Sequence, residues 1–153
     1  MHSVLFICSA NVCRSPMAMG LLQAYVGQEI GEWRIESAGV WSLEGYPAAQ
    51  NAQIVVKTYG VDLSMHRSRL ISADMVKDFN LILTMERGHK EALRAAFPQF
   101  AGRIFMLSEM VGEVHDVVDP MGRALADFEE TAQEINKVFK LGEARIQNLS
   151  GDP

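Results

Sequence analysis

Residues 4–16 constrain the fold more than any other part of the chain. Residues 4–7 form a short, continuous apolar run that is typical of a buried strand. The nonapeptide at residues 8–16 follows directly, and Pro16 suits the start of a helix, where a missing N–H has no cost. Apolar residues then recur at helical spacing, at Met17, Leu21, Leu22, Tyr25 and Val26. A buried strand that passes through a tight loop into a helix is typical of a parallel sheet with helical crossovers.

The rest of the chain repeats this alternation of strand and helix. Strands are predicted at residues 33–37, 80–85 and 103–107. Helices are predicted at residues 48–59, after Ser72, at residues 87–96, and as one long amphipathic helix over residues 124–149. No repeat or linker divides the chain, so residues 1–153 are expected to form a single domain. The pattern predicts an α/β fold with a parallel sheet covered by helices on both faces.

The loop places a thiol, Cys8, six positions before Arg14. A cysteine at a strand end projects its sulfur into the following turn, and the next backbone N–H groups can form an anion-binding nest at a helix start. Arg14 can bind two phosphate oxygens with its planar guanidinium, and Ser15 can donate a hydrogen bond to a Cys8 thiolate. We therefore predict a phosphate-binding loop that follows the nucleophile Cys8 and comprises Ser9, Ala10, Asn11, Val12, Cys13, Arg14 and Ser15.

These cysteines have two other interpretations. A lone cysteine that ends a strand is usually a buried packing residue. Cys8 and Cys13 could also form half of a metal site, but the chain has only two cysteines and no second ligand pair at a usual zinc spacing. No metal is therefore expected. The combination of strand, Cys-x5-Arg-Ser loop and helix favours the phosphate site.

Composition narrows the possible functions. With 153 residues and 48% hydrophobic residues, the chain is long enough for one compact core. It has no apolar stretch near the about 20 residues that span a bilayer, and we expect a cytoplasmic protein without membrane insertion. A formal net charge of −5 disfavours nonspecific nucleic-acid binding, so an anionic substrate must be attracted locally.

The sequence resembles the low-molecular-weight protein tyrosine phosphatases of the bacterial type. The resemblance covers nearly the whole chain and rests on residues 8–16, 37–39, 66–69, 81–86 and the Asp119-Pro120-x-Gly122 motif. It implies a flavodoxin-like, four-stranded parallel sheet and a phosphomonoesterase reaction that uses no cofactor. The implied substrate is phosphotyrosine in a protein, and the oligomeric state is left open.

The resemblance also assigns roles to matching residues. It implies that Cys8 attacks phosphorus to give a phosphocysteine, that Arg14 binds the phosphoryl group, and that Asp119 is the general acid. Taken alone, Asp119-Pro120 would more often simply begin a turn. The resemblance further implies a supporting polar network of Asn11, Ser15, Ser37 and His66, while Arg67 and Arg69 are expected to be structural or surface charges.

Cys13 has two compatible interpretations. It can be a small buried side chain at a helix start. The resemblance implies, in addition, a redox partner that forms a reversible disulfide with an oxidised Cys8 and so prevents irreversible oxidation.

Some positions depart from the family pattern and bear on the substrate slot. Ala10 stands where glycine is frequent, and Met121 stands where many relatives have an aromatic residue. Trp41 either stacks on a tyrosyl ring or simply packs as a large apolar residue. Val12 favours phosphotyrosine, because phosphoarginine-directed relatives have threonine at the matching position. Val12, Trp41 and Met121 are the predicted slot residues.

Alternatives from other functional classes remain. A phosphoarginine phosphatase is one. Arsenate reductases share the fold and the Cys-x5-Arg loop, but an internal thiol relay needs later cysteines and none follows Cys13, so only a route through an external thiol stays open. A catalytically weak phosphate-binding module is disfavoured by the presence of both Cys8 and Asp119.

Overall fold

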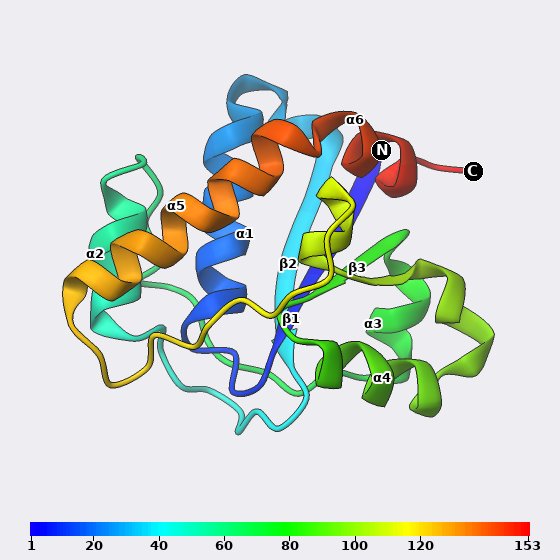
Figure 1. Cartoon of the computed structure of the whole chain (residues 1–153), viewed down its shortest axis with the longest axis horizontal. Coiled ribbons are helices and arrows are strands. Elements are labelled where there is room, and N and C mark those ends of the chain that lie inside the picture. Colours follow the sequence, from blue (N-terminus) through cyan, green and yellow to red (C-terminus); the bar gives the residue numbers. More distant parts are fainter.

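A four-stranded parallel sheet forms the centre of the computed structural model, which describes residues 1–153 (Figure 1). The strands are β1 (His2–Cys8), β2 (Trp33–Gly39), β3 (Leu81–Thr84) and β4 (Ile104–Met106). They lie in the order β2-β1-β3-β4, and every neighbouring pair is parallel. The predicted α/β class and parallel four-stranded sheet are confirmed.

Helices cover both faces of this sheet and make a three-layer sandwich (Figure 1). The α-helices are α1 (Arg14–Val26), α2 (Gln50–Lys57), α3 (Ala73–Asp78), α4 (Arg87–Ala96), α5 (Leu125–Leu141) and α6 (Glu143–Ser150). Three 3₁₀ segments, η1 (Gly27–Glu32), η2 (Pro98–Arg103) and η3 (Leu107–Val111), complete the chain.

The side chains of β1 explain why its sequence is continuously apolar. Val4 and Phe6 pack into the larger core with α1, α2, α5 and α6. Leu5 and Ile7 point to the other face, into a smaller core that includes Val76 of α3 and Leu93 of α4. A central parallel strand is buried on both faces, so alternation of apolar and polar residues is lost.

The order of the strands places the end of β1 at a topological switch point. The chain leaves β1 through α1 to reach β2 on one side, and later crosses to β3 on the other side of β1. The carboxyl ends of β1 and β3 therefore lie side by side, and Met85 N–H donates to the Ile7 carbonyl at 3.0 Å. Ligands of open α/β sheets bind in the crevice at such a point.

Gly39 lets the end of β2 approach the loop after β1. A Cβ at this position would lie 2.5 Å from the Ser9 carbonyl oxygen and 2.8 Å from the Cβ of Ser42. Next to it, Val40 N–H donates to the Cys8 carbonyl and Trp41 N–H to the Ser9 carbonyl, both at 3.0 Å. The absence of a side chain at Gly39 thus allows the loop to lie directly on the edge of the sheet.

The long helix predicted over residues 124–149 is wrong as a continuous element. It is broken at Gly142, where α5 ends and α6 begins at Glu143. A Cβ at Gly142 would lie 2.9 Å from the carbonyl oxygen of Met110, so the glycine permits close contact with η3. The apolar stripe continues across the break, since Phe139 and Ile146 are both buried. Helical periodicity alone did not reveal the change of direction.

None of the helices combines the length and apolar character needed to cross a membrane.

Candidate active site

The loop that follows β1 has an unpaired set of backbone donors. None of the N–H groups of the five residues from Ser9 to Cys13 donates a hydrogen bond within the protein. The loop leads from Cys8, the last residue of β1, to Arg14, the first residue of α1. Pro16 is the third residue of that helix and stays within its first turn. Free N–H groups beside a helix N-terminus form a site suited to an anion.

Asn11 holds the shape of this loop. It is the only residue other than glycine with positive φ, at 60°, and it is fully buried. Its side-chain amide donates to Ser15 Oγ at 2.8 Å and to Ser37 Oγ at 3.0 Å, and its Oδ1 accepts from Arg69 N–H at 3.1 Å. These bonds connect the loop to β2 and to the segment after α2. They stabilise a left-handed conformation that is rare outside glycine.

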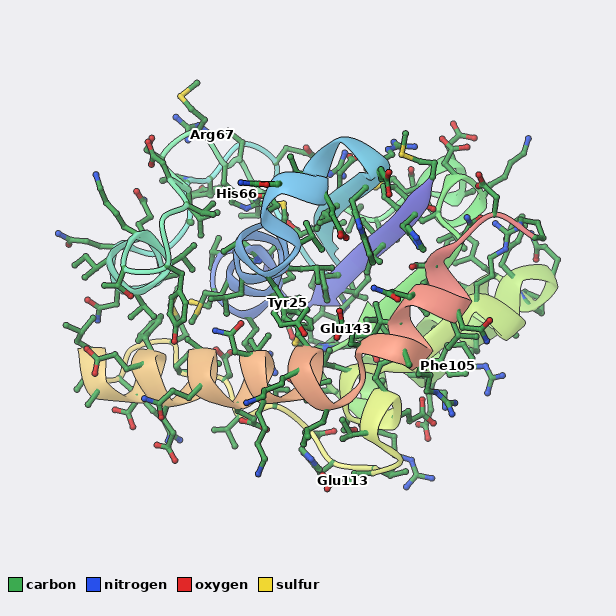
Figure 2. The ribbon with its side chains drawn as sticks, turned by 90° about the horizontal axis from the view of Figure 1, so that it is seen from above. Tyr25, His66, Arg67, Phe105, Glu113 and Glu143 are labelled. Atoms are coloured by element: carbon green, nitrogen blue, oxygen red, sulfur yellow. The ribbon has the colours of Figure 1, made fainter.

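His66 completes the predicted supporting network from the opposite side. Its Nε2 donates to the Asn11 carbonyl at 2.8 Å. Burial lowers the pKa of His66 and favours the neutral ring, although the hydrogen bond to the Asn11 carbonyl acts in the opposite direction. Figure 2 shows His66 and Arg67 on the segment between α2 and α3. The structure thus brings Asn11, Ser15, Ser37 and His66 together as predicted.

The two arginines of this segment have structural contacts. Arg69 pairs with Glu36 at 2.7 Å and donates to the Ser37 carbonyl at 3.0 Å. Arg67 bonds to the carbonyls of Ser64 and His66 at the surface. These contacts agree with the expected structural roles of both arginines.

Cys8 lies beside a hydroxyl donor. Its sulfur is 2.9 Å from Ser15 Oγ. Because Ser15 Oγ accepts from the Asn11 amide, its own proton is free to point at the sulfur, and the carbonyl of Ala38 is farther away at 3.4 Å. A hydrogen bond of this kind stabilises a thiolate.

Arg14 is almost fully buried, with 2% of its side chain exposed, and is held from three directions. NH1 donates to the Val117 carbonyl at 2.8 Å and pairs with Glu86 at 2.6 Å, while NH2 lies 3.7 Å from Asp119 Oδ2. Val117 is itself tied to the end of β3, because its N–H donates to the Met85 carbonyl at 2.8 Å. The guanidinium orientation is therefore fixed by the surrounding protein.

Asp119 lines the same hollow as Cys8. Its side chain is 49% exposed, and its Oδ1 accepts from Met121 N–H at 3.0 Å. A small hollow of about 40 Å³ is lined by Cys8, Ala10, Val12, Cys13, Arg14, Asp119 and Met121. The predicted nucleophile, arginine and acid thus share one hollow with the unpaired loop, although they are far apart in the sequence.

Comparison with known proteins decides the family. The sequence matches the family described as low molecular weight phosphotyrosine protein phosphatase over residues 3–148. The chain belongs to this family.

Individual relatives agree with that assignment. The chain is 35% identical over 147 residues to a probable low molecular weight protein-tyrosine-phosphatase, EpsP, of Ralstonia nicotianae, covering 96% of this chain and 97% of that protein. The structure of this chain is similar to that of a low molecular weight protein tyrosine phosphatase from T. tengcongensis, with a TM-score of 0.88 and 37% sequence identity. The match covers 95% of this chain and 99% of that protein. The structure is also similar to the YwlE arginine phosphatase from Geobacillus stearothermophilus, with a TM-score of 0.87, 29% identity, and coverage of 97% and 94%.

The predicted substrate-slot residues occupy two different environments. Val12 and Met121 line the hollow above Cys8. Trp41 lies outside that lining and is 85% exposed, although its backbone N–H is bonded to the Ser9 carbonyl. A packing role for Trp41 in the core is therefore wrong, while its stacking on a substrate ring stays a prediction.

Sequence reasoning missed two side chains next to this phosphatase site. Glu86 pairs with Arg14, and His89 contacts both Ser9 and the backbone of Glu86. Residues 81–86 carry part of the family resemblance, but the resemblance assigns no role to Glu86. A usable signal was present, because an acidic residue directly after an apolar parallel strand lies at the ligand-binding edge of the sheet.

A larger hollow lies elsewhere and includes none of the loop residues. It measures about 220 Å³ and is lined mainly by apolar side chains near the end of α1 and the start of α6. Figure 2 shows Tyr25 and Glu143 close together in this region. The larger volume therefore does not make it the candidate active site, because none of the predicted site residues lines it.

Cys13 and Cys8 differ in chemistry despite equal exposure. Both are reduced and each is 3% exposed. Burial, followed by the negative charges of Asp119 and Cys8, raises the pKa of Cys13 to about 12. The Cys13 sulfur donates to the Met121 sulfur at 3.4 Å, which also favours the protonated thiol.

We expect iodoacetamide at neutral pH to modify Cys8 and to leave Cys13 unmodified. A thiol with a pKa of about 12 is only about 10⁻⁵ ionised at pH 7, and the thiolate is the reactive form. Intact-mass measurement should show one adduct on the parent protein, one on Cys13→Ser and none on Cys8→Ser over the same time. Equal labelling of Cys8→Ser and Cys13→Ser would contradict the assignment.

Proposed function

We propose that the chain hydrolyses phosphotyrosine residues of proteins, with Cys8 as nucleophile, Arg14 as phosphoryl ligand and Asp119 as general acid. The observation that carries this proposal is the single hollow in which Cys8, Arg14 and Asp119 meet beside five unpaired N–H groups. The N–H groups and Arg14 supply fixed donors for the equatorial phosphoryl oxygens. Such preorganised donors stabilise the transition state of phosphoryl transfer.

The reaction has two steps. In the first, the Cys8 thiolate attacks phosphorus, the bond from phosphorus to the tyrosyl oxygen breaks, and Asp119 gives its proton to that oxygen. In the second, Asp119 takes a proton from water, the water oxygen attacks phosphorus, and the sulfur–phosphorus bond breaks. Phosphate and the Cys8 thiolate are released, and Asp119 is protonated again for the next cycle.

The neighbouring residues support these roles. Ser15 can donate to the Cys8 sulfur both before attack and when the thiolate leaves phosphorus in the second step. Asp119 is half exposed at the mouth of the hollow, where a leaving phenol and an incoming water both have access. Cys13 lines the same hollow as Cys8, which supports its proposed role as the partner of an oxidised nucleophile.

The preference for tyrosine rests on the apolar wall of the hollow. Val12 and Met121 offer apolar contacts to an aromatic ring, and neither carries a charge or an oxygen acceptor for a guanidinium. An arginine phosphatase is also among the similar structures, so the choice of substrate needs a direct test.

That test compares peptides of one sequence that carry phosphotyrosine, phosphoarginine or phosphoserine, with arsenate as a separate substrate. We expect phosphotyrosine to have the highest kcat/KM and Cys8→Ser to be inactive on all of them. Val12→Thr introduces a hydroxyl acceptor, and it should shift the ratio of phosphotyrosine to phosphoarginine turnover by about tenfold toward phosphoarginine. A parent protein that prefers phosphoarginine, or that only reduces arsenate, would overturn the proposal.

Replacement of Asp119 tests the proton-transfer role. We expect Asp119→Ala to lower kcat on phosphotyrosine by about 10²–10⁴-fold and to change KM little, since the acid acts on the leaving group. The loss should shrink for aryl phosphates whose phenols are strong acids, because these depart without a proton. Asp116→Ala is the matched control, as Asp116 lies in the same segment but accepts from Arg87 N–H instead of facing Arg14. An equal loss for all leaving groups would remove Asp119 from the acid role.

A further inference from the structure

His89 lies behind the phosphate loop and contacts two parts of the site at once. It belongs to the first turn of α4 and is 6% exposed. Its Nε2 is 2.9 Å from Ser9 Oγ, and its Nδ1 accepts from the backbone N–H of Glu86 at 3.2 Å. The Glu86 carboxylate in turn pairs with Arg14 at 2.6 Å. One imidazole thus connects the start of the loop with the partner of the phosphoryl-binding arginine.

These contacts determine the form of the ring. A backbone N–H can only donate, so Nδ1 carries no proton, and the proton of the neutral ring is on Nε2, directed at Ser9 Oγ. Burial lowers the pKa of His89, and the Arg14 charge acts in the same direction, against the carboxylates of Glu86, Asp116 and Asp119. The neutral tautomer satisfies both ring nitrogens, whereas a doubly protonated ring would oppose the Glu86 N–H.

His89 contacts two residues, Glu86 and Ser9, whose positions affect the candidate site. Glu86 is about one-third exposed, so its carboxylate is not fixed by burial alone. It is the N-cap of α4, and the His89 ring is the acceptor that fixes its backbone. Ser9 is the first residue after the nucleophile, and its N–H is one of the unpaired loop donors. A shift at Ser9 would move the start of the unpaired loop, and a shift at Glu86 would move the carboxylate that holds Arg14.

We propose that His89 is a positioning residue that couples the Ser9 end of the phosphate loop to the Glu86–Arg14 pair, so that loop N–H groups and guanidinium fit the transferring phosphoryl group together. This inference rests on the proposed phosphatase function. It assigns His89 no contact with substrate. Its effect should therefore be greater on ligands that resemble the transition state than on ligands that resemble the product.

The geometry of the ring provides two matched variants. In His89→Asn, the side-chain oxygen can replace Nδ1 as acceptor for the Glu86 N–H, but the amide is too short to reach Ser9. In His89→Gln, the longer amide can replace Nε2 as donor to Ser9 Oγ. Ser9→Ala removes the same hydrogen bond from the other end. Glu91→Gln, on the exposed side of α4, is the control for general effects on the helix.

The experiment measures kcat and KM on para-nitrophenyl phosphate, together with the dissociation constants of vanadate and inorganic phosphate by calorimetry. We expect His89→Asn and Ser9→Ala each to lower kcat about tenfold and to weaken vanadate binding more than phosphate binding, because a displaced loop weakens about one hydrogen bond to the transition state. The kcat of the double variant should be no lower than that of either single variant. His89→Gln should recover activity relative to His89→Asn, and Glu91→Gln should behave like the parent.

Other outcomes would overturn the inference. Additive effects of Ser9→Ala and His89→Asn would show that the two residues act separately. The variants could instead leave the ratio of vanadate to phosphate affinity unchanged and lose kcat in proportion to a lower midpoint of urea unfolding. That result would show that His89 has only a structural role. Because calorimetry needs no turnover, a parent that fails to hydrolyse phosphotyrosine would refute the proposed function while the binding ratios still decide the role of His89.

Discussion

Asn11 adopts a left-handed backbone conformation in the loop, and its buried amide donates to Ser15 and Ser37. Such a conformation is costly for a residue with a Cβ, and it persists because hydrogen bonds from the surrounding structure hold it. The consequence is a loop whose own N–H groups are left unpaired from Ser9 to Cys13. If Asn11 relaxed to an ordinary conformation, these donors would turn away from one another. Cys8, Arg14 and Asp119, the proposed nucleophile, phosphoryl ligand and acid, would then lack a common target.

The positive potential at the candidate site comes from groups next to it and not from the overall charge of the chain. The chain has a formal net charge of −5, yet its site must accept a phosphate dianion. The positive contribution comes from the buried Arg14 and from N–H groups next to the start of α1. Two carboxylates, Glu86 and Asp119, lie beside the guanidinium and have different surroundings. Glu86 is fixed to the start of α4, whereas Asp119 lies at the mouth of the hollow. In the proposed reaction, Glu86 therefore orients Arg14 while Asp119 exchanges protons.

Local sequence patterns predicted Cys8 and Arg14 but could not by themselves predict Asp119 or His89. Cys8 and Arg14 could be predicted from the strand, loop and helix start alone, because all the residues that indicate them lie within residues 4–16. Asp119 needed the family resemblance, since its own context reads as a simple turn. The ring of His89 could not be placed, because its contact with Ser9 exists only once β1 and β3 are paired. The break at Gly142 was missed for a similar reason, as the apolar periodicity continues through it.

The account depends on Cys8 carrying the phosphoryl group during turnover. The most direct measurement is rapid acid quenching of the protein while it turns over a phosphotyrosine peptide, followed by peptide mapping by mass spectrometry. The account predicts one phosphoryl group, bound to the peptide that contains Cys8 and absent from Cys8→Ser. A phosphoryl group on any other residue, or none during a demonstrated turnover, would contradict it.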